Sequence, residues 1–264
     1  TAPISIYRFS SWARATIVPL LVLMKERPVA PAPASASLAD LRAETAPSTP
    51  PPDLVARVFA GIDAVLRAYR KKPLRALQQR ATVEAERWIV EHQEADGSWG
   101  GIQPPWVYSL LALHALGYSN EHRVVKKGLD GMHDRWLVRR PDGRLSVQAC
   151  LSPVWDTALS LAGLLASGAN GQAPEVQRAA KWLLAEEIRV PGDWCVWVRG
   201  VAPSGWAFEF ENDLYPDVDD TAMVVMVLHQ AGALDDATRT RALAWVFAMQ
   251  SKNGGWAAFD KDNT

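Results

Sequence analysis

Residues 88–99, WIVEHQEADGSW, contain a pattern that recurs along the chain and indicates its fold. The pattern is a Trp, a Gln five residues later and a Gly-x-Trp turn, here Trp88, Gln93, Gly97 and Trp99. A copy with identical spacing is Trp245, Gln250, Gly254 and Trp256. We predict a third copy, one residue longer and with Glu in place of Gln, at Trp182, Glu187, Gly192 and Trp194. A fourth, degenerate copy is expected between Leu129 and Gln148, with Gly143 and Leu145 in the Gly-x-Trp place. Such repetition is typical of folds that stack one structural unit.

Each turn joins two helical stretches of opposite polarity. The outer stretches carry charged residues, namely Glu84, Glu86, Arg87, Arg178, Lys181, Arg239 and Arg241. The inner stretches are almost wholly apolar and cover residues 106–116, 154–167 and 220–230. Helix pairs of this kind bury their apolar members, and the sequence therefore predicts an all-α fold of α/α-barrel (toroid) repeats. The Gln amide can bond free backbone groups at helix ends while it stacks on the Trp, so these tryptophans are interpreted as clamps.

The composition narrows the classes of function. The chain has 264 residues, 48% of them hydrophobic, which suffices for one or two cores. A formal net charge of −1 gives no reason to expect nucleic acid as a partner. Cys150 and Cys195 stand in no metal-ligand pattern and imply no disulfide framework. The apolar run at 15–24 is too short to span a bilayer.

The first third of the chain has a different organisation. Residues 1–24 are expected to form one helix, or two that are broken at Pro19. Residues 26–53 are rich in Pro and Ala and are predicted to be a linker or surface loop. Residues 54–72 carry apolar side chains at helical spacing, Val55, Val58, Phe59, Ile62, Leu66 and Tyr69, beside a basic end of Arg67, Arg70, Lys71 and Lys72. This helix either packs on its own domain or lies on an anionic membrane surface, and the pattern leaves both open.

The stretch from Leu214 to Ala222, LYPDVDDTA, places three carboxylates within four residues at the start of an apolar helix. Pro216 is tolerated only at the first turn of a helix, and Asp217 suits the N-cap position. Acidic residues in a first turn complement the helix dipole. A structural helix cap would therefore explain this stretch by itself. Its combination with the repeats is what suggests a catalytic role.

The repeats and the acidic stretch together resemble the squalene–hopene cyclase family of class II triterpene cyclases. Further matching motifs are SWARAT at 11–16, GGIQPPW at 100–106, QACLSPVWDT at 148–157, WAFEF at 206–210 and the segment 250–264. The resemblance covers essentially the whole chain. It implies that a terminal alkene of squalene is protonated and that the polyene cyclises through carbocations to a pentacyclic hopanoid, with no metal or redox cofactor.

Site residues follow from the motif match alone. Asp219 would be the general acid, and Asp217 and Asp220 would anchor it by hydrogen bonds and charge. Cavity residues would be Trp155 and Phe208 near the first rings, and Trp12, Ile102 and Gln103 where later rings form. Tyr215 and Phe259 would flank the acid, and Asp156 would belong to the polar network around it.

The physical chemistry agrees with this assignment. An alkene is a very weak base, so one carboxyl must stay protonated near neutral pH, and crowding carboxylates favours a shared proton. Their titrations are coupled, so that no single pKa belongs to one of them. The helix N-terminus should help Asp217 and Asp220 stay charged. Aromatic faces stabilise cations without capturing them, by about 0.5–2 kcal/mol each.

One departure from the family affects activity. The family has a downstream histidine that tunes the acid, and none of His92, His114, His122, His133 and His229 stands in that motif. We therefore expect the chain to be an internal piece of a longer protein and to be inactive alone. The resemblance also implies a monotopic enzyme on the cytoplasmic face of a bacterial-type membrane, and a homodimer.

Several other functions could use the same residues. A glycoside hydrolase would use Asp219 and Asp156 as its acid–base pair, but its cleft would carry more polar groups than these inner helices offer. A zinc site would need His partners for Cys150 and Cys195, and a magnesium-dependent synthase carries Asp-Asp-x-x-Asp. A class II diterpene cyclase, which would need basic groups for a diphosphate, and a non-catalytic α/α-barrel binding module remain as alternatives.

The domain division also follows the family. Residues 1–145 are expected to form the C-terminal part of a first α/α barrel. Residues 146–264 are expected to form the N-terminal part of a second barrel, which carries the acidic motif. Both barrels would be incomplete, and the cavity would lie between them.

Overall fold

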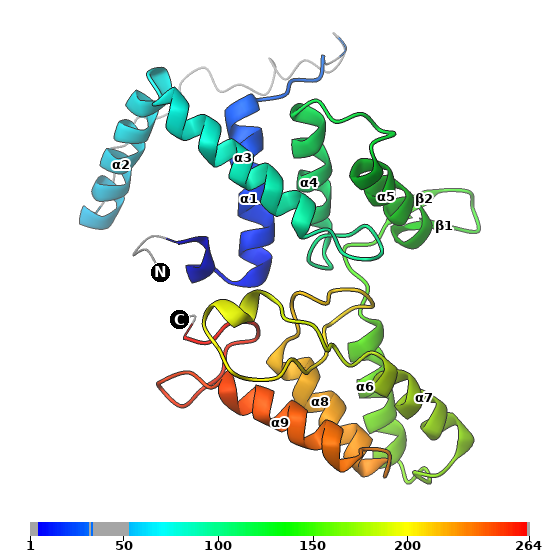
Figure 1. Cartoon of the computed structure of the whole chain (residues 1–264). Coiled ribbons are helices and arrows are strands. Elements are labelled where there is room, and N and C mark those ends of the chain that lie inside the picture. Colours follow the sequence, from blue (N-terminus) through cyan, green and yellow to red (C-terminus); the bar gives the residue numbers. More distant parts are fainter. Residues whose placement is uncertain (1–4, 32, 34–52, 263–264) are drawn as a thin grey trace. The chain divides into compact units, whose positions relative to one another are not determined.

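The computed structural model describes residues 5–31, 33 and 53–262. The chain divides into two compact units, one of residues 1–26 with 85–264 and one of residues 27–84. Of the predicted linker at 26–53, residues 32 and 34–52 lie outside the described part. The described part is dominated by α-helices, so the predicted all-α fold class is confirmed, whereas the closure of helices into barrels and the boundary near residue 145 stay predictions (Figure 1).

The helices of the larger unit come in the order that the repeat predicts. They are α1 (Ser11–Glu26), α4 (Gln103–Ala115), α5 (Arg123–Gly131), α6 (Pro153–Ala166), α7 (Pro174–Ala185), α8 (Val218–Gln230) and α9 (Asp236–Ala248). Helix α3 (Arg75–Glu91) ends in this unit, and short helical turns are η1 (Ile6–Arg8), η4 (Met132–Trp136) and η5 (Asp193–Val196). Pro19 lies inside α1, which is a single helix and is not broken there.

Two main apolar clusters hold the larger unit together. In the first, α1 packs on α4, and Val18 and Val22 share a core with Trp106 and Leu113. In the second, α6 packs on both α7 and α8, and Leu161, Leu183 and Leu228 from these three helices share one core. A smaller cluster brings Trp194 edge-on to Trp245, with ring centroids 5.9 Å apart. The nearly all-apolar helices α4, α6 and α8 thus place only part of their side chains in these cores, and Leu111, Leu159, Leu164 and Met226 on them are exposed.

The Trp of the repeat is a clamp, as predicted. The indole Nε1 of Trp99 donates to the carbonyl of Ile89 at 2.6 Å, and that of Trp256 donates to Val246 at 2.7 Å. Each acceptor is the residue directly after the first Trp of its copy. The Gln93 amide donates to the carbonyls of Gly97 and Val124, and Gln250 donates to Gly254, so the predicted role of the Gln amide in bonding backbone groups is confirmed.

The third copy of the repeat was assigned to the wrong Trp. The clamp on Leu183, which follows Trp182, comes from Trp206 and not from Trp194, with Nε1 2.6 Å from the Leu183 carbonyl. A backbone bond confirms the equivalence. In all three copies, the backbone amide of the residue after the Gln or Glu donates to the carbonyl of the residue before the clamp Trp. These bonds run from Glu94 to Ser98, from Ser251 to Gly255 and from Ile188 to Gly205. The turn after Glu187 is therefore much longer than in the other copies, and Trp194 lies in the extra segment.

The fourth, degenerate copy is also different from the prediction. Residues 129–148 contain the π-helical turn η4 and then the strands β1 (Leu137–Arg139) and β2 (Leu145–Val147), which pair antiparallel. Gly143 lies in the hairpin turn, and Leu145 lies in β2 and is exposed, so neither completes a clamp. Without a Trp to bury at position 145, the segment can satisfy its backbone bonds as a hairpin.

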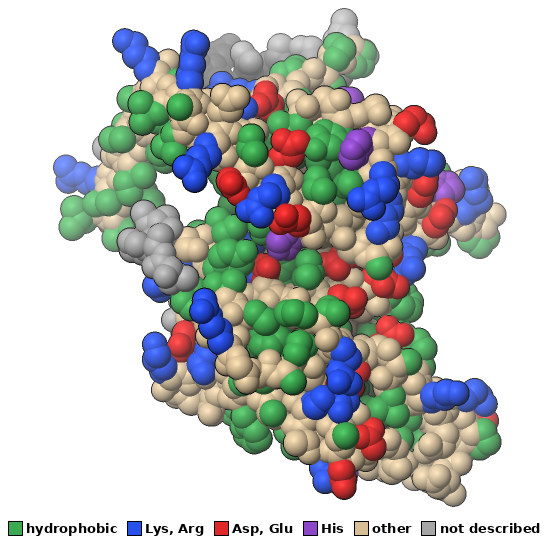
Figure 2. All heavy atoms as spheres, viewed as in Figure 1, with side chains coloured by type: hydrophobic (Ala, Val, Ile, Leu, Met, Phe, Trp, Pro, Cys, Tyr) green, Lys and Arg blue, Asp and Glu red, His purple; other side chains and the backbone are tan. Residues whose placement is uncertain are grey.

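The smaller unit contains helix α2 (Leu54–Lys71) and most of α3. The α2 helix was predicted at 54–72 and begins with the Asp53 carboxylate accepting from the Ala56 amide at 2.7 Å. Its large apolar side chains are all exposed, and Figure 2 shows them beside basic side chains. Among the described residues, no helix is long and apolar enough to cross a membrane.

Candidate active site

The acidic stretch is the N-terminus of α8, as the sequence predicts. Asp217 is the N-cap, and its carboxylate accepts from the Asp220 amide at 2.7 Å. The entry to the helix is fixed by backbone bonds from distant segments. Asp217 donates to the carbonyl of Trp206 at 3.0 Å, and Val218 donates to Ala258 at 2.8 Å. The carboxylates therefore sit on a backbone that is held from both sides.

The three carboxylates have different surroundings. Asp217 and Asp220 are each only 2% exposed, whereas Asp219 between them is exposed. Burial, and next the charge of Asp220, raises the pKa of Asp217 well above its ordinary value. Burial raises the pKa of Asp220 to about 6, against a hydrogen bond from Asp217 that lowers it. Both shifts have the direction that burial and crowding of carboxyls produce, and a proton shared between them stays a prediction.

The pKa directions correct one expectation. The helix dipole was expected to help Asp217 and Asp220 stay charged, but desolvation outweighs the dipole, which amounts to about 0.3–1 kcal/mol at an exposed helix terminus. The pKa of Asp217 is accordingly raised, which favours its protonated form. The assignment of Asp219 as the general acid stays a prediction.

Three predicted aromatic residues meet in one cluster. The Trp12 ring on α1 lies edge-on to Phe208, with centroids 6.3 Å apart and an interplanar angle of 79°. The same ring lies 4.8 Å from Phe259 at 54°. The motif match divided these residues among regions near the first rings, the later rings and the acid. The structure brings them together from three separate segments, each half-buried.

Tyr215 is buried directly before the acidic stretch. Burial, and next the charge of Asp193, raises the pKa of its phenol well above the ordinary value. Its ring lies under the Arg14 guanidinium at 5.9 Å and 6.5 Å from the His92 ring. Tyr215 is therefore a buried, uncharged phenol directly before the acidic stretch, and its role beside the acid stays a prediction.

The other predicted cavity residues lie at the starts of two inner helices. Ile102 is the N-cap of α4 and forms an isolated antiparallel β-bridge with Cys150. The backbone amide of Gln103 donates to the Ala149 carbonyl at 2.9 Å. Trp155 is half-buried on α6. Asp156 beside it is exposed and accepts from the Ser152 hydroxyl at 3.0 Å.

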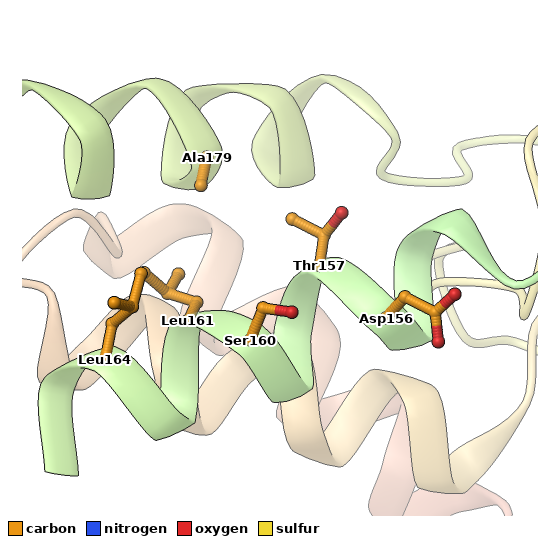
Figure 3. A pocket seen from close by; sticks show the side chains of 6 residues that line it. All are labelled: Asp156, Thr157, Ser160, Leu161, Leu164 and Ala179. Carbon is orange, nitrogen blue, oxygen red and sulfur yellow. The ribbon is translucent and has the colours of Figure 1, made fainter. Parts of the chain in front are cut away.

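Asp156 also lines an open hollow between α6 and α7. Figure 3 shows its carboxylate together with the other lining side chains of α6, which are Thr157, Ser160, Leu161 and Leu164. Ala179 on α7 lies opposite them. No described residue of the acidic stretch lines this hollow, and a place for Asp156 in the network around the acid stays a prediction. The described residues also hold no group of three or more His, Cys, Asp or Glu side chains suited to a metal ion.

Comparison with known proteins settles the family. Residues 1–142 match the family model of the squalene–hopene cyclase N-terminal domain, and residues 151–264 match that of the C-terminal domain. The chain belongs to the squalene–hopene cyclase family. The squalene–hopene cyclase of Alicyclobacillus acidocaldarius is 41% identical over 271 residues, which cover 99% of this chain and 42% of that protein. The dammaradiene synthase of Dryopteris crassirhizoma is 39% identical over 268 residues, covering 98% of this chain and 39% of its own length.

A third relative of the same family is the squalene–hopene cyclase of Zymomonas mobilis, 34% identical over 290 residues, which are 99% of this chain and 42% of that protein. The chain therefore spans about two fifths of the length of these relatives. Membership of this family of cyclases, the central prediction from the motifs, is confirmed.

An ion-pair cluster beside the acid was not assigned from the sequence. The Arg14 guanidinium binds the carboxylates of Asp193 and Asp260, and Asp193 also binds His92. Arg14 stands in the matching motif SWARAT, and a charge in an otherwise apolar helix start is a signal for a buried ion pair. Its partners are far away along the chain, so spacing could not have revealed them.

Two buried glutamates form a second unassigned feature of the cyclase chain. Glu94 and Glu209 are each 4% exposed. Burial, and next the charge of Asp96, raises the pKa of Glu209 to about 8. Burial, and next the charge of Asp213, raises the pKa of Glu94 well above its ordinary value. Glu94 follows the repeat's Gln93 and Glu209 follows Phe208, and no periodic pattern in the sequence distinguishes them from exposed glutamates.

Proposed function

We propose that this chain is part of a squalene–hopene cyclase-type isomerase that protonates a terminal alkene of squalene and cyclises the polyene to a pentacyclic hopanoid. The observation that carries the proposal is the acidic stretch itself. It places Asp219 at a helix start between two buried carboxyls whose pKa values are raised by burial. The names of the relatives at 41% and 34% identity support the same substrate.

The proposed first step is a proton transfer from the Asp219 carboxyl. Its O–H bond breaks, the alkene π electrons form a C–H bond at the CH carbon of the terminal alkene, and a tertiary cation remains on the neighbouring carbon that carries two methyl groups. Each following ring forms when the next alkene attacks the cation, and loss of a proton ends the sequence. Hydrogen count is conserved, so the reaction is an isomerisation.

The neighbouring carboxyls have supporting roles in this step. Burial favours the protonated form of Asp217, which can donate a hydrogen bond, while the pKa of Asp220 is raised to about 6. The Trp12, Phe208 and Phe259 rings offer faces to the cations, at about 0.5–2 kcal/mol each. An apolar aromatic wall also excludes the water that would otherwise capture a cation.

The proposal is tested with a chain of the relatives' full length that contains these 264 residues, called here the full-length cyclase. Asp219→Asn should abolish conversion of squalene, because an amide cannot supply the proton, while the circular dichroism spectrum stays unchanged. Asp236→Asn is the matched control, since Asp236 is an acidic residue in the first turn of the neighbouring helix α9. Equal conversion by wild type and Asp219→Asn would refute the assignment and favour a binding module.

We also propose that the isolated 264-residue chain is inactive, because it spans about two fifths of its relatives' length and no histidine of the tuning motif is among its five. Turnover of squalene by the purified 264-residue chain would contradict this.

We further infer that the cyclase works as a monotopic protein on the cytoplasmic face of a membrane, with α2 as a contact. A substrate as apolar as squalene resides in lipid. The exposed face of α2 carries Phe59 and Ile62, and the basic end carries Arg70 and Lys71. Asp63 is the one acidic residue of the helix and is paired with Arg67. Apolar area together with basic charge is what binds a helix to an anionic surface.

Liposome flotation of the full-length cyclase tests this contact. Phe59→Ser with Ile62→Ser should move the protein from the lipid fraction to the soluble fraction on vesicles containing anionic lipid. Phe247→Ser on α9 is the control, because Phe247 is 63% exposed and Phe59 is 65% exposed. Flotation of the double variant at the wild-type level would exclude α2 as the contact.

A further inference from the structure

Arg14 is a fully buried cation that joins three segments. Its Nε donates to Asp193 at 3.1 Å, and its Nη1 and Nη2 donate to the two carboxylate oxygens of Asp260 at 2.9 and 3.4 Å. The side chains of Arg14, Asp193 and Asp260 are 0%, 10% and 1% exposed. Nη1 also donates to the Phe9 carbonyl at 2.6 Å, so a rigid fork of donors is satisfied within the protein.

The Asp260 branch leads to the acidic stretch and to the aromatic cluster. Asp260 follows Phe259, whose ring lies 4.8 Å from Trp12. Two residues before Asp260, the carbonyl of Ala258 accepts from the amide of Val218, the residue directly before Asp219. The pair of Arg14 with Asp260 thus ties both an aromatic wall and the helix start to α1.

The Asp193 branch reaches the same stretch from its other side. The Asp193 amide donates to the carbonyl of Leu214 at 3.2 Å. Gly192 allows this approach, since a Cβ there would lie 2.2 Å from the same carbonyl oxygen. The Asp193 carboxylate is held in turn by His92 at 3.1 Å, and the Arg14 guanidinium lies over the Tyr215 ring.

We propose that Arg14 is a positioning residue for the acid, which fixes the stretch from Leu214 to Asp219 relative to the Trp12 ring through Asp193 on one side and Asp260 on the other. The inference rests on the proposed function and adds a residue that acts through others. Arg14 itself touches no reacting atom in this account.

A purely structural role is the competing explanation. Burial of a guanidinium with two carboxylates is costly, and well-packed apolar residues often give equal or greater stability than such a group. What the charged cluster offers is direction, because the planar fork of Arg matches carboxylates in a defined geometry that Lys lacks. A positioning role therefore predicts changes in rate and product that exceed the changes in stability.

The test compares Arg14→Lys, Asp260→Asn and the control Arg8→Gln in the full-length cyclase with squalene as substrate. Arg8 lies on the neighbouring turn, is exposed and stacks on Trp197, and has no place in the Arg14 cluster. The readouts are kcat, KM, the fraction of incompletely cyclised products and the melting temperature.

We expect Arg14→Lys to lower kcat by about 100-fold with KM within about twofold, since a misplacement of about 1 Å can cost that factor. Asp260→Asn keeps the shape of the side chain and should raise the fraction of incompletely cyclised products several-fold, because Phe259 is released. Arg8→Gln should match the wild type in all four readouts.

Two results would overturn the proposal. One is a kcat and product pattern like the wild type in folded Arg14→Lys and Asp260→Asn proteins. The other is a loss of activity in both variants that parallels a loss of folded protein at the assay temperature, with normal products from the folded fraction. Failure of the proposed function looks different, since the wild-type full-length cyclase would then form no cyclised product at all.

Discussion

Replacement of Asp220 by Asn should change how the stability of the chain depends on pH. Asp220 is buried, and its pKa is raised from 3.8 to about 6, first by burial and then by the charge of Asp219. Below about pH 4 the carboxyl is protonated in the folded and unfolded states alike, and stability is fully present. Between pH 4 and 6 the unfolded chain releases this proton while the folded chain retains it, so stability falls as pH rises and the loss is complete above pH 6.

The size of the effect follows from the two pKa values. Moving a buried carboxyl from 3.8 to about 6 corresponds to about 3 kcal/mol of stability lost across that window. Asn carries no titrating proton, so Asp220→Asn should be more stable than the wild type at pH 7 by up to about 3 kcal/mol and gain nothing at pH 4. Asp217 titrates together with Asp220, so the measured window belongs to the pair.

Urea unfolding at pH 4, 5, 6 and 7, followed by tryptophan fluorescence, measures this difference. Buried carboxyls that do not interact with Asp220 contribute the same slope to both proteins and cancel in the comparison, whereas the response of the coupled Asp217 is part of the measured difference. The exposed Asp236→Asn is the control and should follow the wild type at every pH. A difference between Asp220→Asn and the wild type that stays constant from pH 4 to 7, or that changes with the opposite sign, would refute the reasoning.

Two further predictions concern the reassigned repeat. Trp206→Phe removes the buried bond to the Leu183 carbonyl and should cost about 2–4 kcal/mol of unfolding free energy, whereas Trp256→Phe, at a 43% exposed site, should cost about 1 kcal/mol. Equal losses in urea unfolding would mean that Trp206 is not the clamp. Gly205→Ala should cost about 2–5 kcal/mol, because φ is +122° and its Cβ would lie 2.8 Å from the Thr221 hydroxyl. A melting temperature within 2 °C of the wild type, about 0.5–1 kcal/mol at this size, would contradict it.

The repeat could be found from the sequence because its spacing is a local property. The Gln-to-Trp turns of the first and last copies have the same length, and each carries its own helix and clamp. The third copy misled the prediction because a long segment separates Glu187 from its true clamp, Trp206. A second Gly-x-Trp, at Gly192 and Trp194, stands in that segment at almost the expected distance.

The acidic helix start was predictable for a similar reason, since caps and first-turn charges depend on neighbours in sequence. What decides the pKa of Asp217 is burial by remote segments, and the dipole argument from the sequence therefore gave the wrong sign. The Arg14 cluster depends on partners that only the folded chain brings together. The motif match located Arg14 without giving it a role.

Incorporation of solvent deuterium tests the central claim most directly. The full-length cyclase is incubated with squalene in D₂O, and the cyclised product is isolated and examined by mass spectrometry and NMR. Protonation by Asp219 predicts one carbon-bound deuterium per product molecule, in the ring methylene group next to the dimethyl carbon where the first cation forms, and no product from Asp219→Asn. A cyclised product without deuterium, or deuterated product from Asp219→Asn, would contradict the account.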